Sequence, residues 1–128
     1  MKLITKPIAA ALSAAYAHSA VTGESGLDVV AKFFTPWSGA TWFISEGLPV
    51  NDAGEELAPE AVKLIDPDTV DWHLFGFCDL GDATNAELGY VRLSDLKGLK
   101  GPAGLAVERD INYSGTMAEV MAEYGRTA

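Results

Sequence analysis

A chain of 128 residues fits one domain, residues 1 to 128, which is large enough to bury a core without disulfides or metal ions. Its composition, 48% hydrophobic and 21% charged, excludes the disordered and collagen-like classes. Nine basic residues against eighteen acidic ones give a net charge of -9. Because lysines and arginines supply the affinity for a phosphate backbone, we expect no direct binding to duplex DNA.

The first twenty residues, MKLITKPIAAALSAAYAHSA, permit two interpretations. A basic tip, an alanine-rich middle and small residues near Ala15 and Ala17 resemble a secretory signal. The apolar run is short, however, and is interrupted by Ser13, whereas Ile8, Leu12 and their neighbours recur at helical spacing. We expect an amphipathic helix docked on a cytoplasmic domain that has no membrane span.

Residues 29 to 46 predict a β-hairpin. A strand rich in β-branched and aromatic residues ends at Pro36, a short turn follows, and TWFIS returns as the second strand. Side chains alternate between the two faces of a strand, so both faces carry aromatic rings, as in a sheet covered on both sides. We expect most of these rings to be core. Trp37, in the turn, is expected to face a partner together with Lys32 and Thr35.

Residues 47 to 71 contain seven acidic residues, three prolines and a single lysine. They predict a polar acidic excursion with a short helix near Pro59 to Ile65, either a solvated loop or a docking surface for a basic partner. DWHLFGFCDL and ELGYVRL then predict a second hairpin, residues 72 to 93, joined by polar turn residues.

The last third of the chain predicts one more strand and one more helix. Glycines and Pro102 exclude a long helix after the second hairpin, and LAVERDINY has the pattern of a fifth strand. Thr116 and Glu119 form a capping box before an apolar stripe of helical period. The predicted fold is α+β: about five mainly antiparallel strands with an N-terminal and a C-terminal helix.

The sequence contains no complete catalytic or cofactor signature. Cys78 is the only cysteine, which excludes an internal disulfide and fits a buried, unreactive thiol. His18 and His73 lack the spacing of metal ligands, and no phosphate-binding glycine motif is present. We therefore expect no cofactor, no metal and no catalytic residue.

Several segments together resemble a bacterial family of unknown function that is carried on plasmids and integrated mobile elements. They are LITK, KFFTPWSGATWF, LFGFCDLG, ELGYVRLSDL and GPAGLAVERD, in this order. The resemblance covers most of the chain except residues 47 to 71 and the last helix, and in relatives the stretch between TWF and LFG is usually shorter. It implies an intracellular protein of mobile DNA. Some relatives carry the label of single-stranded DNA endonuclease, without an established mechanism.

A metal-dependent nuclease would require converging carboxylates, often with a lysine that stabilises charge. Glu108 and Asp110 share one face of the expected fifth strand, about 6.6 Å apart at ~3.3 Å per residue. Lys32 and Glu87 join them only if the order of the strands brings them close. The simpler interpretation is that Glu108 and Asp110 belong to a solvated strand face.

Arg109 falls between Val107 and Ile111, on what should be the apolar face of that strand. An isolated buried charge is costly, so we expect Arg109 to pair with a carboxylate or to bind an anion or a partner.

The function that these observations favour is that of a small acidic accessory protein of a bacterial mobile element. It would act by binding a protein partner, in evasion of host defence or in maintenance of the element, through Lys32, Thr35, Trp37 and Arg109. The alternative is a metal-dependent nuclease or another enzyme acting on single-stranded DNA, built from Glu87, Glu108 and Asp110.

Overall fold

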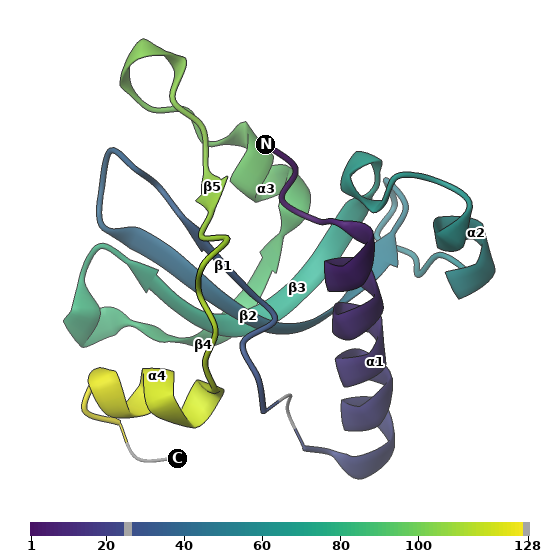
Figure 1. Cartoon of the computed structure of the whole chain (residues 1–128), viewed down its shortest axis with the longest axis horizontal. Helices are drawn as coiled ribbons and strands as arrows, with labels where there is room; N and C mark the ends of the chain where they lie inside the picture. Colours follow the sequence, from purple (N-terminus) through teal and green to yellow (C-terminus); the bar gives the residue numbers. More distant parts are fainter. Residues whose placement is uncertain (25–26, 127–128) are drawn as a thin grey trace.

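The computed structural model describes residues 1–24 and 27–126 and shows an α+β domain in which helices surround one sheet (Figure 1). This confirms the predicted fold class. The helices are α1 (Lys6–Thr22), α2 (Pro59–Lys63), α3 (Leu93–Gly98) and α4 (Met117–Glu123), and the strands are β1 (Ala31–Phe34), β2 (Ala40–Val50), β3 (Asp71–Leu80), β4 (Glu87–Arg92) and β5 (Glu108–Arg109).

All five strands belong to one antiparallel sheet in the order β4-β3-β2-β1-β5. The two predicted hairpins are confirmed: β1 pairs with β2 across the turn after Pro36, and β3 pairs with β4. The long ladder between β2 and β3 forms the centre of the sheet and contains a bulge between Ile44 and Glu46. The sheet order therefore places β4 and β5 at opposite edges.

Two strand boundaries differ from the prediction. Strand β2 continues to Val50, so the acidic excursion covers residues 51 to 70 rather than 47 to 71. Pro49 is tolerated because β2 pairs with β1 only as far as Ile44, which leaves the Pro49 end of the strand at an edge. The fifth strand is much shorter than expected and contains only Glu108 and Arg109.

One face of the sheet holds the larger core. Phe33, Trp42 and Trp72 are almost fully buried there, where Leu12 of α1 and Leu96 of α3 complete the same cluster. Each of these side chains removes apolar surface from water at about 25 cal/mol per Å², the main favourable contribution to folding. The expected core role of Phe33 and Trp42 is confirmed.

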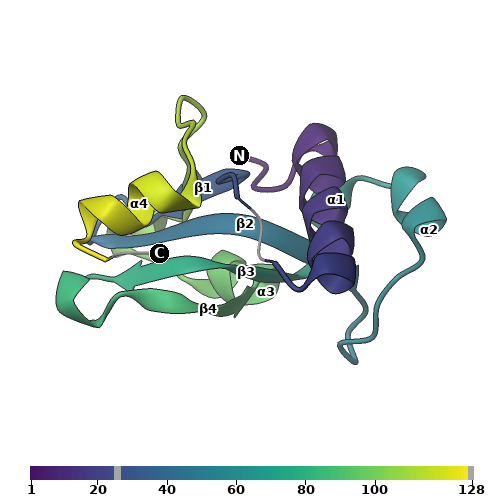
Figure 2. The same ribbon diagram turned by 90° about the horizontal axis from the view of Figure 1, so that it is seen from below.

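The opposite face carries a smaller core under α4. Phe43 and Phe77 pack there against Val120, and the ring of Tyr124 lies 4.8 Å from that of Phe77. Figures 1 and 2 show α4 and α1 toward opposite ends of the sheet. Both faces are thus covered, as the aromatic alternation predicts. Phe34, which was expected in the core, is only partly buried.

Local signals predict the start of α4 but only part of the start of α1. The capping box before α4 is present, since Thr116 Oγ1 accepts a hydrogen bond from the Glu119 amide and the Glu119 carboxylate accepts one from the Thr116 amide. Thr5 occupies the position before α1, but its side chain makes no capping hydrogen bond.

The glycines Gly76 and Gly89 face each other across β3 and β4 and provide a matched test of packing. A methyl group on Gly76 would overlap the carbonyl oxygen of Phe43, whereas one on Gly89 would meet no atom within 4 Å. We expect Gly76→Ala to lower the free energy of unfolding by ~3 kcal/mol and Gly89→Ala to change it by less than ~1 kcal/mol. Urea denaturation of both variants measures the difference. Equal effects would contradict the close approach of Gly76 to Phe43 in the pairing of β3 with β2.

Tyr124 predicts an alkaline loss of stability. Burial and the hydrogen bond that its hydroxyl donates to Asp79 Oδ2 at 2.7 Å raise the pKa of Tyr124 to about 12. The folded pKa lies above the ordinary value of ~10, so the protonated Tyr124 hydroxyl stabilises the folded state. This contribution to the free energy of unfolding is complete below pH ~10 and is lost as the pH rises toward ~12. Urea midpoints measured from pH 8 to 11.5 should fall more steeply for the native chain than for Tyr124→Phe. Parallel pH profiles would disprove the assignment.

Candidate functional site

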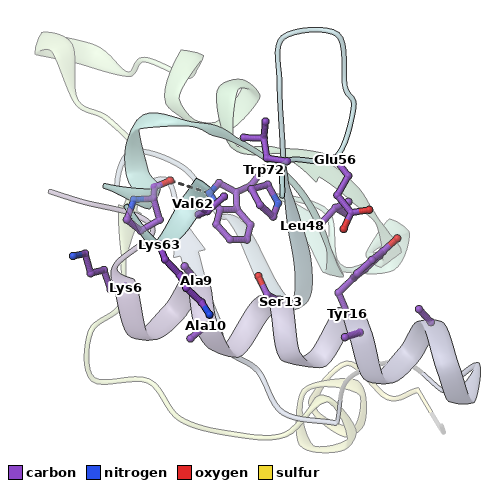
Figure 3. Close-up of a pocket in the computed structure, with 15 residues that line it drawn as sticks. Lys6, Ala9, Ala10, Ser13, Tyr16, Leu48, Glu56, Val62, Lys63 and Trp72 are labelled. Atoms are coloured by element: carbon purple, nitrogen blue, oxygen red, sulfur yellow. Dashed lines mark hydrogen bonds between the residues drawn. The ribbon is translucent and has the colours of Figure 1, made fainter. Parts of the chain in front are cut away.

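A groove of about 630 Å³ runs between α1 and the excursion that carries α2 (Figure 3). We call it the α1–α2 groove. Apolar side chains form most of its lining, with charged side chains near its ends and Ser13 near its middle. The lining residues are Lys6, Ala9, Ala10, Ser13, Tyr16, Ala17, Ala20, Leu48, Pro49, Glu56, Leu57, Val62, Lys63, Pro67 and Trp72.

The α1 wall of the groove is made of small side chains. Ala9 and Leu12 are buried against the sheet, while Ala10 and Ala17 line the groove and remain exposed. Alanine has high helix propensity and occupies little space, so α1 stays helical and still leaves a hollow beside it.

Trp72 of β3 also lines the groove and is fully buried. Its indole Nε1 donates a hydrogen bond to the carbonyl oxygen of Pro67 at 2.9 Å, so the buried polar atom is satisfied and the ring orientation is fixed. The dashed line in Figure 3 marks this bond.

The opposite wall belongs to the acidic excursion, which is folded onto the domain rather than being only a solvated loop. The Leu57 amide donates to the Pro49 carbonyl, and Val50 forms a β-bridge with Glu56. Val62 of α2 is buried and belongs to the larger core. These contacts anchor the excursion at both its start and its middle.

The two ends of the groove carry different charges. Lys6 and Lys63 lie at one end, and Glu56 and Tyr16 lie toward the other (Figure 3). Lys6 and Lys63 are exposed, and within the described residues neither forms an ion pair. The groove is therefore an apolar channel that is positive at one end and acidic at the other.

Lys32, expected on a binding surface, is held within the fold. Its Nζ lies 3.8 Å from Asp110 Oδ2, 5.4 Å from the centroid of the Phe43 ring and 5.0 Å from that of Tyr113. The carboxylate and the two rings together offset the charge of a side chain that is only 26% exposed.

The carboxylates of the nuclease alternative do not converge. Glu108 lies opposite Phe34, and the Asp110 amide donates to the Lys32 carbonyl oxygen, so both acidic residues lie at one edge of the sheet. Glu87 lies in β4 at the other edge, about 19 Å away at ~4.8 Å per strand. Within the part of the chain that the structure describes, no three His, Cys, Asp or Glu side chains are grouped to hold a metal ion.

Thr35 and Trp37 do not form the exposed surface that the turn predicts. Thr35 is only 4% exposed, and its hydroxyl bonds with that of Ser38 to brace the turn. Trp37 is partly buried against the larger core, and its ring covers Gly101, where any Cβ would overlap it. The chain folds back over the turn after α3, a contact too distant in sequence for local patterns to reveal.

Arg109 has no carboxylate within salt-bridge distance among the described residues, so the expected ion pair is wrong. Its Nε donates to the Lys2 carbonyl oxygen at 3.4 Å instead, because the N-terminal segment runs beside β5. Arg109 is paired with Phe33 and Lys32 is paired with Phe43, so the two cations point to opposite faces of the sheet. A single surface through Lys32 and Arg109 is excluded, and the part of each in binding stays a prediction.

Cys78 lies outside the groove and is partly buried. Burial, and then the nearby Glu87 carboxylate, raise the pKa of the Cys78 thiol to about 11. A thiol with a raised pKa is a poor nucleophile at neutral pH, in agreement with the expected unreactive side chain.

Residues 60–128, just over half of the chain, match the family described as Protein of unknown function (DUF2958). The chain belongs to this family. The part of the DUF2958 chain that matches begins within α2 and includes β3, β4, α3, β5 and α4. Of the groove lining, Val62, Lys63, Pro67 and Trp72 lie inside the match, whereas α1 and the residues up to Leu57 lie outside it. No match was found among curated proteins or among solved structures. Within residues 1–24 and 27–126, no helix has both the length and the apolar run that crossing a membrane requires.

The groove was missed by sequence reasoning, although α1 contains one signal of it. Apolar residues lie on every side of this helix, which is typical of a helix that is covered on more than one side. The helical spacing of Ile8 and Leu12 predicts one docked face and assigns no role to the alanines that line the groove.

Trp37 is now expected to stabilise the domain. Because its ring covers Gly101 and the edge of the larger core, Trp37→Ala should lower the free energy of unfolding by ~2 kcal/mol, less than the ~3 to 5 kcal/mol expected for the fully buried Trp42→Ala. Chemical denaturation of both variants compares the two rings. A Trp37→Ala protein as stable as the native chain would restore the exposed-anchor hypothesis.

Proposed function

We propose that this protein is a small acidic accessory protein of a bacterial mobile element that acts in the cytoplasm by binding a protein partner in the α1–α2 groove. The observation that carries the proposal is the groove itself, an apolar channel with a few polar groups at its ends. Exposed apolar surface that is rimmed by polar residues marks protein interaction sites and ligand-binding grooves. The link to mobile elements is supported by the sequence resemblance alone.

The shape of the groove favours a segment of a polymer over a compact metabolite. Its α1 wall extends from Lys6 to Ala20, ~21 Å at 1.5 Å per residue. Such a length, beside a helix whose outer alanines are exposed, suits a chain that enters at one end and leaves at the other.

The charge of the protein supports a protein partner over a nucleic acid. A net charge of -9 repels phosphate backbones and attracts basic protein surfaces, which accelerates their encounter with the groove. The nuclease alternative has no comparable support, since Glu87 lies at the opposite edge of the sheet from Glu108 and Asp110.

A bulky residue placed in the groove should prevent binding while the fold is retained. Ala10 and Ala11 are adjacent and exposed on α1, but only Ala10 lines the groove. Peptides selected from a random phage-displayed library on the native chain should bind Ala11→Phe normally and should lose at least ~10-fold in affinity for Ala10→Phe. Fluorescence titration of the selected peptides measures this, with thermal melts to confirm that both variants fold.

Two results would overturn the proposal. One is a library that yields no binder to the native chain. The other is a set of binders whose affinity is the same for Ala10→Phe, which would place the binding surface outside the groove.

A further inference from the structure

The cross-section of the α1–α2 groove limits what can occupy it. A volume of about 630 Å³ spread over ~21 Å of α1 gives a mean cross-section of ~30 Å². An α-helix with side chains is ~10 to 12 Å wide on every side, whereas an extended strand takes up only ~4.8 Å between its neighbours. The strand is therefore the occupant that fits a narrow groove better, with its alternate side chains pointing inward.

The length of the groove sets the length of the bound segment. At ~3.3 Å per residue, ~21 Å of groove accommodates about six residues of extended chain. Side chains of an extended segment alternate, so about three of the six point inward. The groove lining is largely apolar, with Leu48, Leu57, Val62 and Trp72 among the contributors, so apolar side chains suit these inward positions.

The lysines at one end of the groove differ from most of the other basic residues. Lys2, Lys32, Arg92 and Lys97 each lie within salt-bridge distance of an aspartate. Lys6 and Lys63 form no ion pair within the described residues, although the chain has twice as many acidic as basic residues.

At the other end, Glu56 and the Tyr16 side chain border the groove (Figure 3). A carboxylate there accepts hydrogen bonds from a basic group, and a phenol both donates and accepts. The two ends of the groove therefore select opposite charges in an occupant.

Resting on the function proposed above, the geometry points to a specific ligand class: an extended peptide segment of about six residues, apolar at its inward positions, with a carboxylate at the Lys6 and Lys63 end and a basic group at the Glu56 end. Apolar burial supplies most of the affinity. The charged ends add only a few-fold each to the affinity, because ion pairs at exposed positions are weak. Their role is to fix the direction in which the segment lies.

Four phage-displayed hexapeptide libraries test this inference on the full chain. All have randomised central positions, and their two ends are fixed as Asp and Lys, Lys and Lys, Asp and Asp, or Ser and Ser. We expect binders from the Asp and Lys library to bind most tightly. In the double variant Lys6→Glu with Lys63→Glu, the same binders should weaken at least ~10-fold, and the Lys and Lys library should become the best source.

The matched control is Lys100→Glu, since Lys100 is also exposed but does not line the groove. It makes the same change in net charge per site and should leave the ranking of the libraries unchanged. Ala10→Phe should abolish binding from every library. Transferred nuclear Overhauser effects on a synthetic copy of the best binder should show the sequential contacts of an extended chain.

The outcomes separate this inference from the proposed function. Binders that are lost in Ala10→Phe but arise equally from all four libraries leave the groove as the site and overturn the charge selection. Helical contacts in the bound peptide overturn the extended conformation. Binders whose affinity is the same for Ala10→Phe overturn both the inference and the proposed function. Both are also overturned if dodecanoate binds the groove more tightly than every peptide in competition, since the groove would then be a site for a small amphiphile.

Discussion

The rest of the structure depends on the antiparallel ladder between β2 and β3. It extends from Ala40 paired with Leu80 to Val50 paired with Asp71, and it is longer than any other pairing in the sheet. One half of this ladder carries Phe43 and Phe77 beneath α4. The other half carries Trp72 and ends beside α1, so one pair of strands supports both the smaller core and the groove.

The same ladder explains why a long excursion is tolerated between its strands. Val50 and Asp71 are paired, so the twenty intervening residues start and finish at one point, and the entropy of closing such a loop grows only slowly with its length. Contacts of Leu57 with Pro49 and of Val62 with the core then order the segment. A loop that is closed and packed in this way can serve as a rigid wall.

Local patterns were sufficient to predict the elements with strong local determinants. Pro36 and the alternation of aromatic residues placed the first hairpin, and the reciprocal bonds of Thr116 and Glu119 placed the start of α4. The end of β2 was not predictable in this way. Gly47 and Pro49 both weaken a strand. Gly47 is explained by its close approach to β3, where a Cβ would crowd Leu74 and His73, and Pro49 by the lack of β1 beside this end of β2.

The candidate site was less predictable than the fold because it depends on the order of strands and on contacts between distant segments. Spacing along the chain predicts that Glu108 and Asp110 share one face of their strand, but it contains no information on which edge of the sheet holds them, on whether Lys32 lies beside them or on which edge holds Glu87. Likewise, no local pattern shows that Trp37 meets Gly101 or that α1 faces the excursion. Some of the residues that local chemistry assigns to binding, such as Thr35 and Trp37, therefore stabilise the fold instead. The groove is formed by tertiary packing, which local patterns do not show.

The acidic residues of the excursion illustrate how a charge pattern can be misjudged. Asp68 accepts hydrogen bonds from the amides of Leu3 and Ile4 and pairs with Lys97, so it joins the N-terminal segment to α3. Asp66 pairs with Lys2, and the hydrogen bond from that lysine holds the pKa of Asp66 below its ordinary value. These carboxylates act within the chain, where they fix the start of α1 against the excursion. The N-terminal segment that leads into α1 is thus joined to the excursion by charges that sequence alone would assign to solvent or to a partner.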